Sequence, residues 1–182
     1  MTPILGILAS GMSGNLWAPG KDFDSIATAT GTGSSGVLTF SSIPSTYRHL
    51  QLRVFMKAAS GSSQCNIRYN GDTATNYTLH TLYGSGTAAS AAGAANQTQF
   101  SVGAVESSTN PWTASIIDIL DYKDTNKYKT TKLLFGYDSN GGGELGLYSG
   151  AWMSTTAISS LTLTMGVNFT TTTVAALYGI KG

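Results

Sequence analysis

Six residues have the glycine spacing of a nucleotide-binding turn. Gly31, Gly33 and Gly36 in "GTGSSG" fit G-x-G-x-x-G, the pattern whose backbone cradles a dinucleotide pyrophosphate at the start of a helix. The residues that follow, "VLTFSSIP", alternate apolar and polar side chains and reach Pro44, so no helix is predicted there. We therefore interpret the motif as a hairpin loop whose glycines supply positive φ angles, and we expect no cofactor.

Nucleophilic catalysis has few candidate residues in this chain. His49 and His80 are the two histidines, and a Ser–His or Cys–His mechanism needs one of them as its base. Both fall inside predicted strands, where we expect surface or interface hydrogen bonds. The single cysteine, Cys65, is expected to be a small buried residue. The sequence predicts no catalytic site and no enzyme.

The densest acidic group is the only candidate for metal binding. Asp118, Asp121 and Asp124 lie three residues apart in "IIDILDYKDTNKYK". That spacing on a strand does not put three carboxylates on one face, and a calcium loop alternates its ligands around a glycine. With Lys123, Lys127 and Lys129 beside them, they are interpreted as solvated charges flanking a hairpin turn, and no metal site is predicted.

The charge balance limits the classes of partner. Ten Lys and Arg against nine Asp and Glu give a formal net charge of +1, and charged residues make up 10% of the 182 residues, against roughly 25% in typical domains. No basic run is present, which argues against a nucleic-acid partner, because that affinity comes mainly from neutralising phosphates. A surface rich in hydroxyls and amides suits close packing against neighbours, as in an oligomer or a lattice.

Residues 1–22 are predicted to be an N-terminal arm and linker. The apolar run from Ile4 to Ala9 has no Lys or Arg before it, unlike a signal peptide, and it is far shorter than the ~20 residues that cross a membrane. We expect no export signal and no membrane partner. The arm either closes its own domain as a first strand or lies on a neighbouring subunit. The candidate contact residues are Ile4, Leu5, Ile7, Leu8 and Trp17.

Period-two alternation predicts an all-β domain over residues 23–182. In "HLQLRVFMK" the side chains of Leu50, Leu52, Val54 and Met56 share one face, which is typical of a half-buried strand. About ten such short segments separated by turn clusters indicate an antiparallel sandwich or barrel. The stretch Ala89 to Ala95, "ASAAGAA", is predicted to be a loop.

Aromatic side chains on loops are the candidates for ligand recognition. Most aromatics of a β-sandwich belong to its core, but Trp112 lies in the loop-like "SSTNPWTA". Trp112 and Tyr148 are therefore the candidate exposed recognition residues, and a carbohydrate is the ligand class that such rings would stack on.

Three segments resemble small virion proteins of tailed bacteriophages, including cyanophage-like ones. Phe23 to Arg53, "FDSIATATGTGSSGVLTFSSIPSTYRHLQLR", keeps the order and spacing of that family over about thirty residues. Tyr69 to Gly86, "YNGDTATNYTLHTLYGSG", and Ala175 to Gly182, "AALYGIKG", are similar to it over shorter stretches.

The resemblance implies a fold, a function and a location. It implies a jelly-roll-like antiparallel β-sandwich with an extended N-terminal arm, assembled as a homotrimer. The function implied is that of a non-enzymatic capsid decoration (cement) protein, bound to the major capsid protein or other virion proteins on the outer shell. The alternative is a tail-fibre or receptor-binding tip domain that binds a host glycan. Either would be made in the host cytoplasm without a signal peptide.

Overall fold

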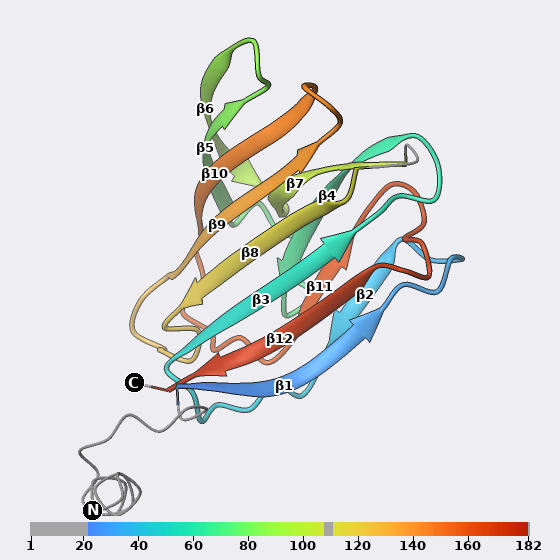
Figure 1. The fold of residues 1–182 in the computed structure, drawn as a ribbon. Coiled ribbons are helices and arrows are strands. Elements are labelled where there is room, and N and C mark those ends of the chain that lie inside the picture. Colours follow the sequence, from blue (N-terminus) through green and yellow to red (C-terminus); the bar gives the residue numbers. More distant parts are fainter. Residues whose placement is uncertain (1–21, 108–110, 182) are drawn as a thin grey trace, which may run out of the picture.

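Among the residues that the structure describes, twelve strands form two antiparallel sheets that face each other (Figure 1). The computed structural model describes residues 22–107 and 111–181, and these residues contain no helix. The all-β sandwich that the sequence predicts is confirmed. The predicted arm, with its candidate contacts at Ile4, Leu5, Ile7, Leu8 and Trp17, lies outside the described residues.

The two sheets differ in width, with eight strands in one and four in the other. In sheet order, the eight-stranded sheet contains β1 (Phe23–Thr30), β12 (Val174–Ile180), β3 (His49–Met56), β8 (Thr113–Leu120), β9 (Lys129–Asp138), β10 (Gly143–Trp152), β5 (Tyr77–Gly84) and β6 (Ala89–Gln97). The four-stranded sheet contains β2 (Val37–Phe40), β11 (Leu161–Thr164), β4 (Ser62–Tyr69) and β7 (Phe100–Glu106).

The strand pairing is that of a jelly roll. β1 pairs with β12, β2 with β11, β3 with β8, and β4 with β7, so that the chain folds back on itself in nested antiparallel pairs. Alternate pairs fall in opposite sheets, and this arrangement produces the two Greek keys of a jelly roll. The eight strands of these pairs make two four-stranded sheets, β1-β12-β3-β8 and β2-β11-β4-β7.

Two hairpins inserted into this jelly roll widen one sheet. The hairpin β9–β10 follows β8, and the hairpin β5–β6 follows β4, and both add to the same edge beyond β8. Of the smaller sheet, the edge strand β7 and Tyr69 of β4 pack against β9, β10 and β5. The far end of the larger sheet therefore projects past the sandwich (Figure 1).

Alternation places the core as the sequence predicts. Leu50, Leu52, Val54 and Met56 of β3 are fully buried, whereas the residues between them point away from the smaller sheet. Cys65 is also buried, as expected, and this burial raises the pKa of its thiol.

The prediction of a loop at Ala89 to Ala95 is wrong. This stretch lies in β6, which pairs with β5 from Gly84 opposite Ala89 to Tyr77 opposite Gln97. Alanine has a low intrinsic strand preference, but a two-residue turn at Gly86 and Thr87 brings the segment beside β5, where the ladder of backbone hydrogen bonds fixes it.

Glycines on β10 make room for two large rings between the sheets. A Cβ atom at Gly150 would lie 1.9 Å from the Phe100 ring, and one at Gly146 would lie 2.1 Å from the Phe135 ring. Phe100 and Phe135 are both about 1% exposed. The rings thus lie against bare backbone, and the sheet needs glycine at these two positions for steric reasons.

We expect Gly150→Ala to lower the free energy of unfolding by about 3 kcal/mol, because the added methyl group overpacks against Phe100 and a backbone oxygen of β5. Urea denaturation measures the loss. The matched control is Gly84→Ala, where the nearest atom to an added Cβ is 3.8 Å away and stability should stay the same or rise slightly. Equal effects of the two substitutions would contradict this packing.

A carboxylate anchors the aromatic cluster at the start of β5. The indole Nε1 of Trp152 donates to Asp72 Oδ2 at 2.7 Å, and Asn76 Nδ2 donates to the same oxygen at 2.9 Å. Trp152 packs against the buried rings of Tyr69 and Tyr77. Hydrogen bonds from Asn76, Trp152 and the Ala74 N–H hold the pKa of Asp72 below its usual 3.8.

This carboxylate should make stability depend on acid. Because the folded pKa of Asp72 is depressed, its contribution is present above pH 3.8 and is lost as the pH falls through the folded pKa. We expect Asp72→Asn to cost about 1 kcal/mol at pH 7. The difference between the parent and the variant should shrink toward zero as the pH falls below 3.8 and through the folded pKa. Unfolding curves followed by Trp fluorescence test this, and a difference that does not change with pH would contradict it.

Candidate interaction face

The outward face of the eight-stranded sheet carries large apolar side chains in register. On this face Ile116 of β8 lies opposite Leu134 of β9, which lies opposite Leu147 of β10, which lies opposite Leu82 of β5. A second row runs from Val174 and Phe55 to Leu145. We call the set the apolar face, and its members are Val174, Phe55, Ile116, Leu134, Leu147, Leu145 and Leu82.

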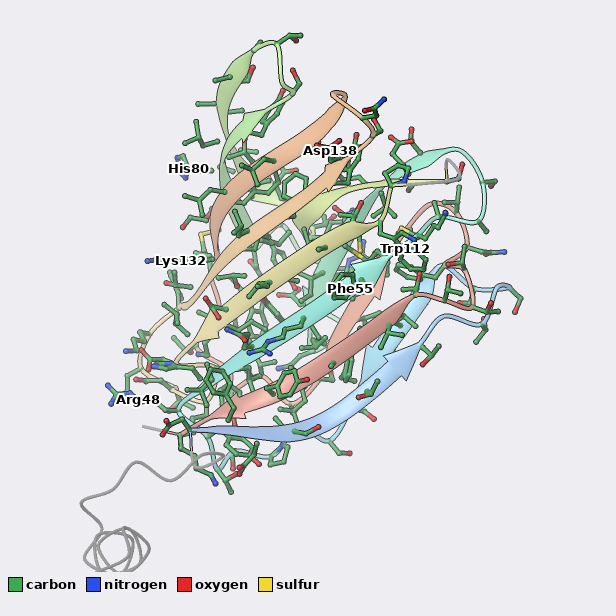
Figure 2. The ribbon with its side chains drawn as sticks, viewed as in Figure 1. Arg48, Phe55, His80, Trp112, Lys132 and Asp138 are labelled. Carbon is green, nitrogen blue, oxygen red and sulfur yellow. The ribbon has the colours of Figure 1, made fainter. Side chains whose placement is uncertain are left out.

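The apolar face is large for a chain that has so few charges. Its seven side chains are between 40% and 62% exposed. Together they expose on the order of 600 Å² of apolar area, the upper end of the ~300–600 Å² found for the largest patch on a typical monomer. Phe55 is labelled in Figure 2, as are Lys132 and His80, two polar residues that are also exposed on the larger sheet. Apolar patches of this size are often functional.

Arg53 and Asp118, two charged residues beside the apolar face, are bound to their neighbours. The Arg53 guanidinium lies over the rings of Tyr178 and Phe23, and its Nε donates to Gln51 Oε1 at 2.8 Å. Gln51 Nε2 in turn donates to Asp118 Oδ1 at 2.8 Å. These contacts hold the polar groups in a row along one margin of the apolar face.

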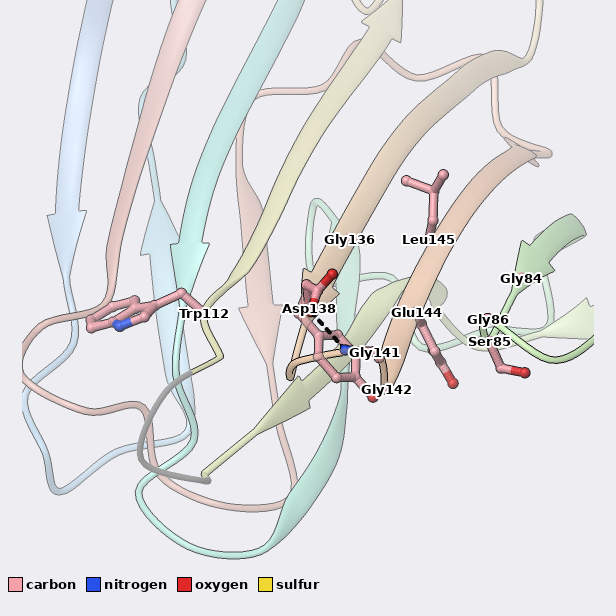
Figure 3. Close-up of a pocket in the computed structure, with 12 residues that line it drawn as sticks. Gly84, Ser85, Gly86, Trp112, Gly136, Asp138, Gly141, Gly142, Glu144 and Leu145 are labelled. Carbon is pink, nitrogen blue, oxygen red and sulfur yellow. Dashed lines mark hydrogen bonds between the residues drawn. The ribbon is translucent and has the colours of Figure 1, made fainter.

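A hollow lies at the opposite margin, beside the β9–β10 turn (Figure 3). It has a volume of about 510 Å³, and Gly136 and Leu145 form part of its lining together with Trp112, Asp138 and Glu144. The Asp138 carboxylate accepts hydrogen bonds from the turn's own backbone, from the N–H groups of Asn140 and Gly141.

One of the two predicted recognition residues is exposed and the other is not. Trp112 is 37% exposed, and the Lys57 ammonium lies 5.5 Å from its ring centroid. Tyr148 is only 7% exposed, so the expectation that it would be exposed is wrong. It points inward from β10, where its ring meets Phe135 edge-on at 5.0 Å, and burial raises its pKa to about 12.

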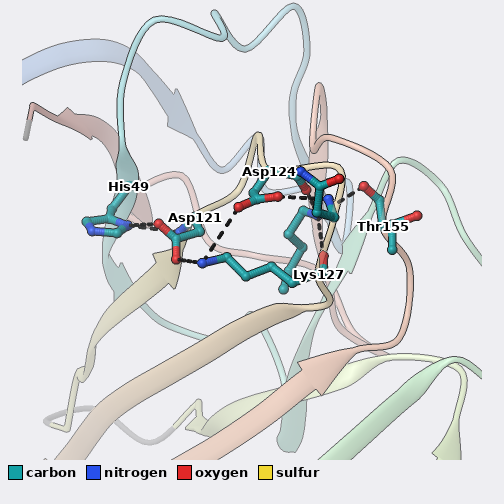
Figure 4. Close-up of polar contacts among 7 residues, drawn as sticks. His49, Asp121, Asp124, Lys127 and Thr155 are labelled. Carbon is teal, nitrogen blue, oxygen red and sulfur yellow. Dashed lines mark hydrogen bonds and ion pairs between the residues drawn. The ribbon is translucent and has the colours of Figure 1, made fainter.

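The acidic group is held by lysine and histidine rather than arranged around a cation (Figure 4). Lys127 Nζ contacts Asp121 Oδ2 at 2.5 Å and Asp124 Oδ2 at 3.6 Å. His49 Nδ1 accepts the N–H of Asp121 at 2.9 Å. Asp118 lies apart from this group, on the outward face. Within residues 22–107 and 111–181, no three His, Cys, Asp or Glu side chains are grouped as a metal site would require.

Lys129 departs from its expected place among solvated charges. Its side chain is fully buried, and its ammonium donates to three backbone carbonyls, those of Asp124, Lys127 and Thr155 (Figure 4). Burial lowers the pKa of Lys129. The buried ammonium ties the β8–β9 connection to the segment after β10, a structural role that no sequence pattern indicated.

The "GTGSSG" motif is a crossover between sheets, and the prediction of a hairpin loop is wrong. It joins β1 of the larger sheet to β2 of the smaller one. Gly33 has a φ of +78°, and its N–H donates to the carbonyl of Phe169 at 3.1 Å. A Cβ at Gly31 would lie 2.1 Å from the carbonyl oxygen of Thr170. The motif therefore needs glycine for its contact with the segment that precedes β12.

Comparison with protein-family models finds no match to this chain, and comparisons with curated proteins and with solved structures find none either. In the part of the chain that the structure describes, no helix is long and apolar enough to cross a lipid bilayer.

Sequence reasoning missed the apolar face, although a signal for it exists. In "KLLFGY" and "SIIDIL", two large apolar residues are adjacent, and adjacent residues of a strand point to opposite faces. One member of each pair, Leu133 or Ile117, is buried, so the other, Leu134 or Ile116, must face outward.

We expect the double substitution Leu134→Ser with Leu147→Ser to change the free energy of unfolding by less than about 1 kcal/mol, since both side chains are already half exposed. Binding of a hydrophobic dye to the folded protein should fall. The control is Leu133→Ser, which empties a buried site and should cost about 3 kcal/mol or more. Loss of stability in the double variant equal to that of the control would show that the apolar face is not a free surface.

Proposed function

We propose that this chain is a non-enzymatic structural protein of a bacteriophage virion, a capsid decoration (cement) protein that binds the outer shell through its apolar face. The observation that carries the proposal is the in-register apolar face on a jelly roll with few charges. The resemblance of Phe23 to Arg53 to phage virion proteins supports it, and that segment covers β1, β2 and most of β3. Viral capsid proteins commonly use jelly rolls.

The size of the apolar face fits a stabilising role. Burying on the order of 600 Å² at 25 cal/mol per Å² gains about 15 kcal/mol before other costs. Association entropy and the ordering of side chains offset much of this gain. What remains would strengthen contacts between neighbouring shell subunits without any chemical step, so the proposal assigns this protein no catalytic residue, metal or cofactor.

The N-terminal arm is a second proposed contact. Ile4, Leu5, Ile7, Leu8 and Trp17 would add apolar area on a neighbouring subunit or on the major capsid protein. This contact rests on the sequence alone, because residues 1–21 lie outside the described part of the chain.

A tail-fibre or receptor-binding tip domain is the second candidate function, because of the hollow beside Trp112. The indole, Asp138 and Glu144 supply the ring and carboxylates that carbohydrate sites combine. Jelly rolls also occur in lectins. In this candidate function a host glycan is the ligand, and the protein is located in the tail.

Binding to particles tests the first proposal. Particles of the phage that encodes the chain, stripped of it, should regain it when the full-length parent is added. The double variant Leu134→Ser with Leu147→Ser should lower occupancy at least tenfold, because the shell then gains little from burying the face. Quantitative gel analysis of sedimented particles measures occupancy.

The control for particle binding is Trp112→Ala, which should leave occupancy unchanged. Equal occupancy for the parent and the double variant would overturn the role of the apolar face. Full occupancy after deletion of residues 1–20 would remove the role of the arm. Glycan-array binding that Trp112→Ala abolishes, with no binding to the shell, would favour the tip domain instead.

A further inference from the structure

The four edges of the two sheets are the strands β1, β6, β2 and β7. An edge strand presents unpaired N–H and C=O groups that another chain can pair with. Natural proteins prevent this with charges, proline, bulges, short strands or a covering element. Comparing the four edges therefore shows where this protein leaves pairing open.

Three of the edges are protected. β1 carries a β-bulge between Ser25 and Ala27, and Asp24 on it forms an ion pair with Lys181 at 2.7 Å. β2 is only four residues long. β7 has a bulge between Ser101 and Gly103 and packs beneath β9, β10 and β5.

Within residues 22–107 and 111–181, β6 has none of these protections along most of its length. It is nine residues long, and the chain has no Asp, Glu, Lys or Arg between Asp72 and Glu106. Its bulge lies near its end, so that Ala89–Ala94 stays in regular register with β5. Every residue of β6 except Ala94 is exposed, and Figure 1 shows the strand at the projecting end of the sheet.

The turn fixes which backbone groups of β6 point outward. The N–H of Ser85 donates to the carbonyl of Ala88 at 3.0 Å, which makes these two residues a hydrogen-bonded pair. Bonded and non-bonded pairs alternate along an antiparallel ladder. The N–H and C=O groups of Ala89, Ala91 and Gly93 therefore point away from β5, toward the open edge.

We propose that β6 pairs antiparallel with β6 of a second copy of this chain, about a two-fold axis at Ala91. This register places Ala91 opposite Ala91 of the second copy, and Ala89 opposite Gly93. Each such pair exchanges two hydrogen bonds, so the outward groups of the three residues make about six in all.

A second copy fits this edge for two physical reasons. The spacing of Ala89, Ala91 and Gly93 is symmetric about its centre, as a two-fold interface requires. Pairing of two β6 strands brings no like charges together, because residues 73–105 contain no Asp, Glu, Lys or Arg. Pairing at β6 would also make one continuous sheet from the larger sheets of the two copies. Leu82 of β5 lies opposite Ala91 of β6, so this row of cross-strand neighbours would continue from one copy into the other.

This proposal does not rest on the virion function, because it concerns only the isolated protein. It also differs from the homotrimer that the sequence resemblance implies. The measured mass distinguishes a dimer from a trimer directly.

Light scattering across a concentration series of the full-length protein tests the pairing. We expect the parent to reach twice the monomer mass. Ala91→Pro should stay monomeric, because proline removes the outward N–H that pairing needs. It breaks no hydrogen bond between β6 and β5. The control Ala91→Ser keeps the N–H and should dimerise like the parent. Ala91→Lys sets two ammonium groups opposite each other and should also be monomeric. Because lysine keeps the backbone N–H, this variant checks that Ala91→Pro does not lose dimerisation through unfolding.

Cross-linking tests the register. In a hydrogen-bonded pair the two Cα atoms are about 5.5 Å apart, within the ~4.4–6.8 Å that a disulfide spans. Mild oxidation should cross-link Ala91→Cys. The matched control, Ser149→Cys, also exposes a thiol on the larger sheet but should not cross-link. Cys65 is buried and should not compete.

A protein that stays monomeric at all concentrations would overturn the proposal. So would a trimer, or a dimer that persists in both Ala91→Pro and Ala91→Lys. Equal cross-linking of the two cysteine variants would overturn the register.

Discussion

The structure depends on a mismatch in width between its two sheets. Four strands face eight, so only part of the larger sheet is covered by the smaller one. Phe100 and Phe135 fill the covered part next to β10, and they fit because Gly150 and Gly146 leave the backbone of β10 bare beneath them. The hairpins β9–β10 and β5–β6 widen the sheet, and their inward residues still contribute to this core. Their outward residues and the strand β6 add surface that the described chain does not bury.

The uncovered surface has two chemically different parts. The apolar face on the outward side of the larger sheet is in register across β8, β9, β10 and β5. Its interactions are hydrophobic, so their strength depends on the area buried. The edge strand β6 has small, uncharged side chains, so its interactions come from backbone hydrogen bonds. These bonds form only when the two strands pair in the correct register. The two parts can be occupied at once, because one is a face and the other an edge.

Much of the fold was predictable because alternation reports directly on burial. The four inward residues of β3, Leu50 to Met56, were assigned to the core correctly. The sequence failed at β6, where pairing with β5 overrides a weak strand preference. It also failed at Lys129, whose three carbonyl partners come from segments that only the fold brings together. Tyr148 is predicted to be exposed but is buried. Its neighbour Leu147 points outward, and adjacent residues of a strand point to opposite faces.

The central claim is that other protein molecules cover the apolar face. An image of an assembled phage particle at subunit resolution tests it most directly. The account predicts that this protein lies on the outer shell with Ile116, Leu134 and Leu147 against a neighbouring protein. A particle in which these three side chains face solvent would contradict it.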